Sequence, residues 1–309
     1  MKTQTPPYVV VLAGGDGTRL CSLTRALYGI DLPKQFAVLD GERSLLQRTI
    51  ERALALTTED RISVVVTANQ QAIAREQLAA YPLVDLVVQP RNLDTAPGIL
   101  LPLARIVARA PSARVIVLPS DHYIADPAPI RGALEGTWSP LLREQITVIG
   151  VAPTSAEPEY GWIVPGRAIG DTGALWVEAF REKPRAEVAA QLREHGGLWN
   201  TFVFTAEAGV LWNRARELLP HHVRALEVYA GAIGQPDEAD ALLLAYRDMQ
   251  PANFSREVLA RTEELAVIPV RGSGWADWGS PSRVFETLAG TPSHARLLQR
   301  IRGEIKVAS

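Results

Sequence analysis

The sequence predicts an α/β fold in which helices cover both faces of a mainly parallel sheet. Two observations carry this prediction. Short apolar runs suited to buried strands recur through the first half of the chain, and segments with helical apolar spacing separate them. The runs are residues 9–12, 62–66, 84–88, 115–118 and 146–151. Regular alternation of strand and helix is typical of parallel sheets, because each parallel connection needs a crossover that a helix supplies.

Two of the intervening helices carry recognisable start signals. Ser44 is followed three residues later by Gln47, which is a capping-box pattern. Asp126 stands before Pro127, so a capping side chain precedes a proline suited to the first turn. We therefore expect helices to begin just after Ser44 and at Pro127.

The pattern changes after residue 160. Short strands are expected at residues 162–164, 175–180 and 201–205, with Gly, Asp and Pro between them. We interpret this segment as a small mixed or antiparallel insertion over the carboxyl edge of the sheet. Residues 206–262 favour helices, and a strand at 265–270 leads into a tryptophan-rich loop and two terminal helices.

Bulk composition excludes several classes of function. The chain has 309 residues, of which 47% are apolar and 21% charged, as in ordinary globular proteins. Its net charge is −2 with no long run of one sign, so we expect neither nucleic acid nor membrane as a partner. The N-terminus lacks the apolar core of a signal peptide, and the single cysteine fits a reducing compartment. The sequence thus predicts a cytoplasmic protein.

A glycine-rich turn follows the first strand. Gly14, Gly15 and Gly17 lie within four residues and are followed by Thr18 and Arg19. Backbone N–H groups of such a turn can surround an anion, and an arginine can bind phosphate oxygens bidentately. A tight surface turn with a solvated arginine is the alternative. Neither the Walker phosphate loop nor the dinucleotide fingerprint fits the spacing, which disfavours a simple ATPase or dehydrogenase.

Seven motifs in order extend this signal along most of the chain. The stretch from Leu12 to Leu20, followed by Pro33-Lys34-Gln35-Phe36, resembles the sugar-phosphate nucleotidyltransferases, and most of all their mannose-1-phosphate guanylyltransferase branch. Further matches are Thr95-Ala96-Pro97, Leu118-Pro119-Ser120-Asp121-His122, Tyr160-Gly161-Trp162-Ile163, Phe180-Arg181-Glu182-Lys183-Pro184, Trp199-Asn200 and Gly274-Trp275-Ala276-Asp277-Trp278-Gly279-Ser280. The resemblance implies a Rossmann-like nucleotide-diphospho-sugar transferase fold, of the GT-A-like type.

The resemblance also implies a domain organisation. We expect one nucleotidyltransferase domain over residues 1–290, with a nucleotide half at about 8–150 and a sugar-phosphate half at about 151–290. A C-terminal helix would occupy residues 291–309, without the second, isomerase-type domain of some relatives. Residues 282–309 could form a homodimer contact or could simply close the domain, and the sequence leaves both open.

The implied reaction joins a nucleoside triphosphate to a sugar 1-phosphate and releases pyrophosphate, with GTP and mannose 1-phosphate as the expected pair. The nucleophile is an ionised phosphate oxygen, so the difficulty is repulsion between anions, which cations and a metal relieve. Mg²⁺ is the expected cofactor, and the resemblance assigns its binding to Asp121 and Asp277. For either aspartate, a helix cap or an Asx turn is the alternative.

The remaining site residues are carried over from the matched motifs. The catalytic set is Arg19, Lys34, Asp121 and Lys183. The nucleotide-binding set is Leu12, Ala13, Gly14, Gly15, Gly17, Thr18, Arg19, Thr95, Ala96 and Asp121. The sugar-phosphate set is Tyr160, Gly161, Glu182, Lys183 and Asn200. The charged members could instead be solvated surface residues, and the nearby tryptophans could stack on a sugar or pack in the core.

Some positions depart from the family pattern. They are Cys21-Ser22, Leu93, residues 201–204 and Asn253-Phe254-Ser255-Arg256, which flank the expected nucleotide and sugar sites. Two alternatives to the guanylyl reaction therefore stay open. One is the same chemistry with UTP or dTTP and glucose 1-phosphate. The other is a non-catalytic subunit that senses a nucleotide sugar.

Overall fold

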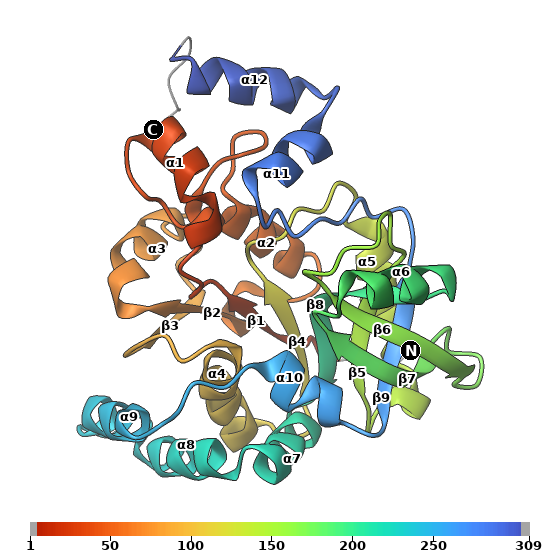
Figure 1. Cartoon of the computed structure of the whole chain (residues 1–309). Coiled ribbons are helices and arrows are strands. Elements are labelled where there is room, and N and C mark those ends of the chain that lie inside the picture. Colours follow the sequence, from red (N-terminus) through yellow and green to blue (C-terminus); the bar gives the residue numbers. More distant parts are fainter. Residues whose placement is uncertain (1–4, 304–309) are drawn as a thin grey trace.

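The computed structural model describes residues 5–303, and the strands in this range form one sheet (Figure 1). Their order is β3-β2-β1-β4-β8-β5-β9-β7-β6. The first four strands pair in parallel: β1 (Tyr8–Leu12), β2 (Ile62–Thr67), β3 (Asp85–Gln89) and β4 (Arg114–Pro119). The predicted parallel sheet is confirmed for this half, and the carboxyl ends of its strands meet at one edge.

The second half of the sheet is mixed. It contains β5 (Ile146–Val151), β6 (Gly161–Ala168), β7 (Leu175–Glu182), β8 (Leu198–Glu207) and β9 (Leu265–Val270). Strand β8 runs antiparallel between β4 and β5, whereas β5 and β9 are parallel. Strand β6 pairs with β7 and also returns to β8, so these five strands close into a barrel-like ring.

This arrangement corrects the predicted insertion. The segment after residue 160 is part of the main sheet and does not form a separate small sheet over its edge, and the sheet is mainly parallel only from β1 to β4. The physical reason lies in β8, which is buried along almost its whole length. A strand buried on both faces belongs at the centre of a sheet, but its sequence does not reveal its direction.

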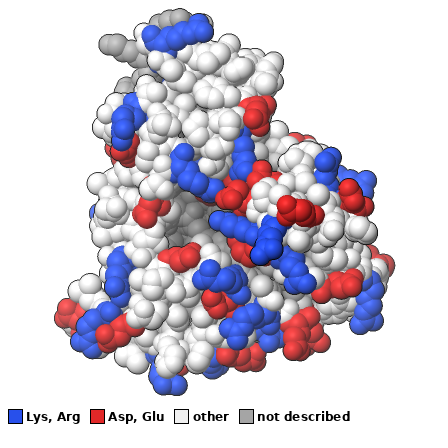
Figure 2. Space-filling view, in the orientation of Figure 1, with Lys and Arg blue, Asp and Glu red and all other residues white. Residues whose placement is uncertain are grey.

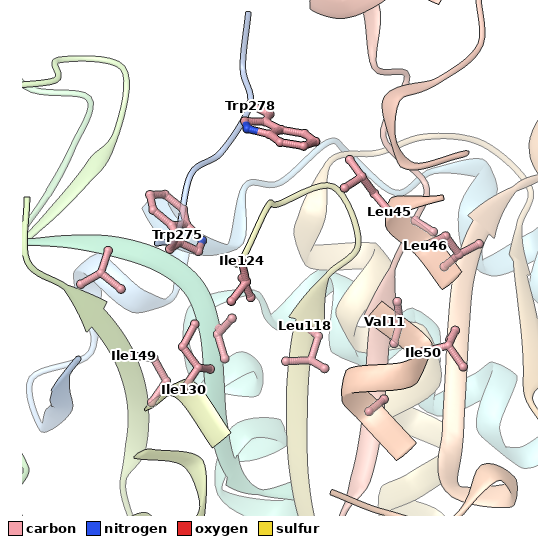
Figure 3. Packing of buried hydrophobic residues seen from close by; sticks show 14 of the residues in the cluster. Val11, Leu45, Leu46, Ile50, Leu118, Ile124, Ile130, Ile149, Trp275 and Trp278 are labelled. Atoms are coloured by element: carbon pink, nitrogen blue, oxygen red, sulfur yellow. The ribbon is translucent and has the colours of Figure 1, made fainter. Parts of the chain in front are cut away.

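Helices cover both faces of the sheet, as predicted. Along β1, Val10 packs in one hydrophobic cluster, and Val9 and Val11 pack in the other. The Val10 cluster lies under α4 (Thr95–Arg109), α7 (Ala208–Leu218), α8 (Pro220–Ala232) and α9 (Glu238–Arg247). The other lies under α2 (Leu45–Leu54), α3 (Gln71–Gln77) and α5 (Ala128–Gly136). Figure 3 shows Val11 facing Leu45, Leu46 and Ile50 of α2.

The predicted helix starts are nearly as expected. The Ser44 hydroxyl accepts from the Gln47 N–H, and the Gln47 side chain accepts from the Ser44 N–H, so the capping box is confirmed. Asp126 accepts from the Ala128 N–H, and α5 begins at Ala128, one residue later than predicted. The remaining helices are α1 (Cys21–Tyr28), α6 (Ala186–Glu194), α10 (Phe254–Glu257), α11 (Pro281–Leu288) and α12 (Pro292–Ile301).

The two terminal helices lie against the main domain. Val284 of α11 and Leu297 of α12 are buried in the same cluster as α2, and α12 contacts α1. Of the C-terminal helix predicted over residues 291–309, residues 304–309 lie outside the described range. The domain boundaries and the homodimer stay predictions. No helix within residues 5–303 is long and apolar enough to cross a membrane.

The strand packing around Gly150 of β5 gives a test of the closed half of the sheet. A Cβ on Gly150 would lie 2.9 Å from Leu198 Cδ1 and 3.0 Å from Val267 Cγ2. Because both neighbours are buried, Gly150→Ala should lower the free energy of unfolding by about 1–3 kcal/mol, measured by urea denaturation.

Gly231, in α8, is the matched control. A Cβ there meets no atom within 4 Å. Gly231→Ala should therefore raise the free energy of unfolding by about 0.5–1 kcal/mol, because alanine favours the helix. Equal stability of the Gly150→Ala and parent proteins would contradict the close packing of β5, β8 and β9.

Candidate active site

A cleft of about 330 Å³ opens at the carboxyl ends of β1 and β4. Figure 2 shows a hollow in the centre of this face of the molecule, with acidic and basic side chains around it. Residues from both halves of the sheet line the cleft. They are Leu12, Ala13, Gly15, Gly17, Arg19, Gln35, Thr95, Pro119, Ser120, Asp121, His122, Glu159, Tyr160, Gly161, Glu182, Asn200, Phe202, Asn253, Ser255, Trp275 and Asp277.

The glycine turn after β1 is held in shape by side-chain amides. Gln35 Nε2 donates to the carbonyls of Ala13 and Gly15, both at 2.7 Å, and Gln70 Nε2 donates to Gly15 at 2.9 Å. At Gly17 the backbone has φ +64°, and a Cβ would lie 2.6 Å from the backbone nitrogen of Lys34. A glycine is therefore needed at Gly17, where the turn packs against the segment that carries Lys34.

Lys34 joins two loops that are far apart in the sequence. Its side chain is buried, and Nζ donates to the Asp277 carbonyl at 2.6 Å and lies 2.9 Å from Asp121 Oδ2. Asp121 follows β4, and Asp277 follows β9. The two aspartates expected to bind a metal are thus brought to one place by a lysine that was expected to approach phosphate.

The Asp121 carboxylate is held in its charged form. Burial by itself would raise its pKa, but the charges of Lys34 and His122 and a hydrogen bond from Lys34 lower the pKa to about 2. His122 Nε2 lies 3.6 Å from Asp121 Oδ1, and Trp275 Nε1 donates to His122 Nδ1 at 3.3 Å. Burial lowers the pKa of His122, so the imidazole is neutral at pH 7.

Asp277 is engaged by several donors. Its Oδ1 accepts from the Tyr160 hydroxyl at 2.7 Å, the Gly279 N–H at 2.9 Å and Arg283 Nη1 at 3.1 Å. Burial would raise the pKa of Asp277, but these bonds and nearby positive charge lower it below the usual value. Arg283 also pairs with Glu157 at 2.6 Å, and its guanidinium lies 4.9 Å from the centre of the Tyr160 ring.

The chemistry of this donor set fits Mg²⁺ at Asp121. The Asp121 side chain is 39% exposed and lines the cleft. Asp277 could coordinate a cation only after Arg283 withdraws, because Arg283 Nη1 donates to both of its carboxylate oxygens, Oδ1 at 3.1 Å and Oδ2 at 3.2 Å. Within residues 5–303, no three His, Cys, Asp or Glu side chains form a group that could hold a metal. A cation here would need oxygens from substrate and water, which is the usual way Mg²⁺ is bound.

The far side of the cleft is built from β6, β7 and β8. Gly161 of β6 pairs with Glu182 of β7, and a Cβ on Gly161 would lie 2.9 Å from Glu182 Oε2 and 3.3 Å from Asn200 Cβ. A larger residue at Gly161 would displace the Glu182 carboxylate from its present position. Burial raises the pKa of Glu182. These three residues of the predicted sugar site therefore lie together in the cleft.

Aromatic rings form a cluster behind this side. Tyr160 makes edge contacts with Trp199 and Trp275, with ring centres 4.8 and 5.4 Å apart. Trp162 lies 6.2 Å from Trp199. Of the four tryptophans considered for sugar stacking, only Trp275 lines the cleft; Trp162, Trp199 and Trp278 are packed in the core.

Backbone strain gathers around the cleft. Within the described range, four residues other than glycine have positive φ: Asp94, Lys183, Phe202 and Trp278. Phe202 lines the cleft, and the other three are each adjacent in sequence to a lining residue. Such strain costs about 1–3 kcal/mol per residue and clusters at functional sites, which supports this cleft as the site of function.

A second hollow of about 450 Å³ adjoins the cleft along the glycine turn. The two share Leu12, Gly15 and Thr95. The residues lining only the second hollow are Gly14, Asp16, Val65, Gln89, Asn92, Asp94 and Gly98. Gln89 is positioned by the Tyr246 hydroxyl, which lies 3.1 Å from its Oε1. Eight of the ten predicted nucleotide-binding residues thus line these two adjoining hollows.

Not every predicted residue lines these hollows. Thr18 and Lys183 are exposed and lie outside both, although the Lys183 N–H bonds the Tyr160 carbonyl. Ala96 is fully buried in α4. Lys34 lies beneath the cleft and acts on it through Asp121 and Asp277. The roles assigned to all of these residues stay predictions.

Sequence reasoning also missed residues of the site. Gln35 belongs to a matched motif, so its position beside Lys34 could have indicated it. Glu159 and the Arg283–Glu157 pair carry no pattern of their own and come to the cleft only through the fold. Phe202, within the departing segment 201–204, lines the cleft. Asn253 and Ser255 line the cleft although they depart from the family pattern, whereas Leu93 is buried in the core.

The fold and the cleft define an α/β protein with a binding site at the carboxyl ends of its parallel strands, where doubly wound sheets bind nucleotides. Comparison with known proteins agrees. The sequence profile described as "Nucleotidyl transferase" matches residues 8–293. The chain belongs to the nucleotidyl transferase family, and the resemblance inferred from the motifs is confirmed at this level.

Individual relatives share about 30% of their aligned residues with this chain. The chain is 31% identical over 304 residues to a mannose-1-phosphate guanylyltransferase of Escherichia coli K12, covering 93% of this chain and 61% of that protein. It is 30% identical over 285 residues to mannose-1-phosphate guanylyltransferase RfbM of Salmonella typhimurium, covering 90% and 58%. The chain therefore spans about three fifths of the curated relatives it matches.

Solved structures support the fold. A crystal structure named mannose-1-phosphate geranyltransferase, from Thermus thermophilus, superposes with a TM-score of 0.78 at 28% identity. The alignment covers 92% of this chain and 80% of that one. The nucleotide-diphospho-sugar transferase fold expected from the sequence is thus supported, with the mixed, ring-closed half described above.

The contact between Lys34 and Asp121 gives a prediction for Asp121 ionisation. Lys34→Met removes the charge that lowers the pKa of Asp121 and leaves the burial that raises it. The pKa should rise from about 2 to the usual value of about 3.9 or above, measured by ¹³C NMR titration of the carboxyl group. Lys183→Met, which removes an exposed lysine, is the control and should leave this pKa unchanged.

The same shift links Asp121 to acid stability. Because its pKa is lower in the folded protein, its stabilising contribution is present above about pH 4 and is lost as the pH falls toward 2. This part of the acid destabilisation should disappear in Lys34→Met. An unchanged pKa in that variant would show that the lysine does not control Asp121.

Proposed function

We propose that this protein is a nucleotidyltransferase that joins a nucleoside triphosphate to a sugar 1-phosphate and releases pyrophosphate. The main observation behind this proposal is that Lys34 Nζ contacts both the Asp121 carboxylate and the Asp277 carbonyl. Asp121 and the Asp277 loop therefore lie side by side near the glycine turn. The membership of the chain in the nucleotidyl transferase family supports this reaction class.

In the proposed reaction, an ionised oxygen of the sugar phosphate attacks the α-phosphorus of the nucleotide. One P–O bond forms, the bond to the β-phosphate breaks, and pyrophosphate leaves with the electron pair. No protein base is needed because the nucleophile is already charged. Arg19 would bind the triphosphate from the glycine turn, and the neutral His122 would leave the positive charge concentrated at Arg19 and Lys34.

Mg²⁺ is the proposed cofactor, held by Asp121 and, once Arg283 releases it, by Asp277. When bound, it would neutralise charge on the reacting phosphates. The low pKa of Asp121 keeps this carboxylate available as a ligand throughout the neutral range. Tyr160, Gly161, Glu182 and Asn200 would meet the sugar phosphate, with Lys183 approaching from the rim.

We further propose GTP and mannose 1-phosphate as the substrate pair. The names of the two bacterial relatives support this choice, and each describes the relative itself. UTP or dTTP with glucose 1-phosphate is the alternative that Leu93, Asn253 and Ser255 keep open, since two of these residues line the cleft and all depart from the family pattern.

The deciding experiment is a matrix of pyrophosphate release with Mg²⁺. GTP, UTP, dTTP, ATP and CTP are each crossed with mannose 1-phosphate and glucose 1-phosphate. Release confined to GTP and mannose 1-phosphate is expected. Preference for UTP would overturn the guanylyl assignment but keep the reaction class. No release from any pair, in folded protein that binds a nucleotide sugar, would favour the sensing subunit.

Asp121→Asn tests the metal assignment. The change removes one negative charge and keeps the shape, so pyrophosphate release should fall at least about a hundredfold. Binding of Mn²⁺, followed by electron paramagnetic resonance, should weaken in parallel. Asp171→Asn, at an exposed position outside the cleft, is the control and should change neither measurement. Full activity of Asp121→Asn with unchanged metal dependence would remove Asp121 from the metal site.

A further inference from the structure

A separate pocket of about 250 Å³ lies behind one wall of the cleft. It opens between the C-terminal half of α2 and the segment from β4 to α5. Pro119, His122 and Trp275 line both the pocket and the cleft, so these residues form a shared wall. None of the expected site residues lines the pocket, and the proposed reaction does not use it.

The floor of the pocket is apolar. Leu118, Ile124 and Ile130 lie close together beside Trp275 in Figure 3, and all four side chains line the pocket. Leu134 and Val203 complete the floor. An apolar surface of this kind favours a ligand with an aromatic or aliphatic body.

The rim carries more positive than negative charge. Arg48 is ion-paired with Asp40, and Arg131 lies 4.0 Å from Glu135. Arg52 differs from both, because it forms no ion pair among residues 5–303 and donates only to Thr49 Oγ1 of its own helix. The one acid on the rim, Glu51, lies 3.5 Å from Arg43.

Arg52 is also partly removed from water. Its side chain is half-buried at the edge of the apolar floor. Burial, together with the charge of Arg48, lowers its pKa to about 10, which still leaves the guanidinium charged at pH 7. The charge of Glu51 acts on Arg52 in the opposite sense but forms no ion pair with it among residues 5–303. A charged group held at an apolar surface without a direct ion pair gains from binding an anion there.

We propose that this pocket binds an organic anion, in which a phosphate or carboxylate group is attached to an apolar or aromatic body. Arg52 holds the anionic group, and the floor around Leu118 and Ile130 takes the body. The ligand then lies against His122, which lines both the pocket and the cleft. Since His122 contacts Asp121 and Trp275, occupancy of the pocket restrains the wall of the cleft.

The test measures binding directly, so it is independent of the proposed reaction. Isothermal titration calorimetry with 1-naphthyl phosphate should detect one site per chain. Arg52→Met keeps the aliphatic stem, removes the charge and should weaken binding at least tenfold. Arg109→Met, which removes an exposed arginine of α4 outside the pocket, is the matched control and should bind as the parent does.

Two further variants distinguish the pocket from the cleft. Arg19→Met removes a cation of the cleft and should leave naphthyl phosphate binding unchanged. Ala55→Phe, at an exposed position on the pocket rim, should block the entrance and abolish binding without disturbing the core. Loss of binding in Arg19→Met, or parent-like binding in both Arg52→Met and Ala55→Phe, would overturn the proposal.

Comparison of ligands identifies the chemical class. Inorganic phosphate should bind at least tenfold more weakly than 1-naphthyl phosphate, because it cannot contact the apolar floor. Equal binding of the two would contradict the apolar part of the site. If 1-naphthyl phosphate binds more tightly than 1-naphthoate, the group that Arg52 prefers is a phosphate. If 1-naphthoate binds more tightly, that group is a carboxylate.

Discussion

The buried amino group of Lys34 holds the two halves of the cleft together. It bonds the Asp277 backbone on one side and the Asp121 carboxylate on the other, although 243 residues separate Lys34 from Asp277. Both partners follow strands of the sheet, β4 and β9, whose ends are fixed by the core. The glycine turn in turn packs against Lys34 through Gly17. Removing this one charge would therefore break the contact to the Asp277 backbone and change the ionisation of Asp121 together.

Part of the charge in the cleft is held in ion pairs. Asp121 is matched by Lys34, and Asp277 and Glu157 share Arg283. Arg19 is exposed and free to meet an incoming anion. In the proposed reaction, a cation bound by Asp277 would have to displace Arg283, which contacts both carboxylate oxygens of Asp277.

The sequence predicted the strands and helices well because their burial leaves local patterns. Residues 265–270 were expected as a strand, and β9 has these bounds. The sequence could not predict where β8 lies in the sheet, because a buried apolar run such as Leu198–Glu207 does not show whether the strand pairs in parallel or antiparallel. The motifs around Asp121 and Gly161 could be recognised because each is a run of neighbouring residues in the sequence, and both residues line the cleft. Arg283 and Glu157 escaped because their role arises only from contacts across the fold.

The aromatic cluster behind the cleft has an optical consequence. Tyr160, Trp162, Trp199 and Trp275 hold fixed orientations with ring centres about 5–6 Å apart. Rings this close exchange excitation energy and couple their transition dipoles, which gives strong near-ultraviolet circular dichroism. Because Trp275 also lines the cleft, the protein carries a built-in chromophore whose spectrum reports on what lies beside it, without any attached dye.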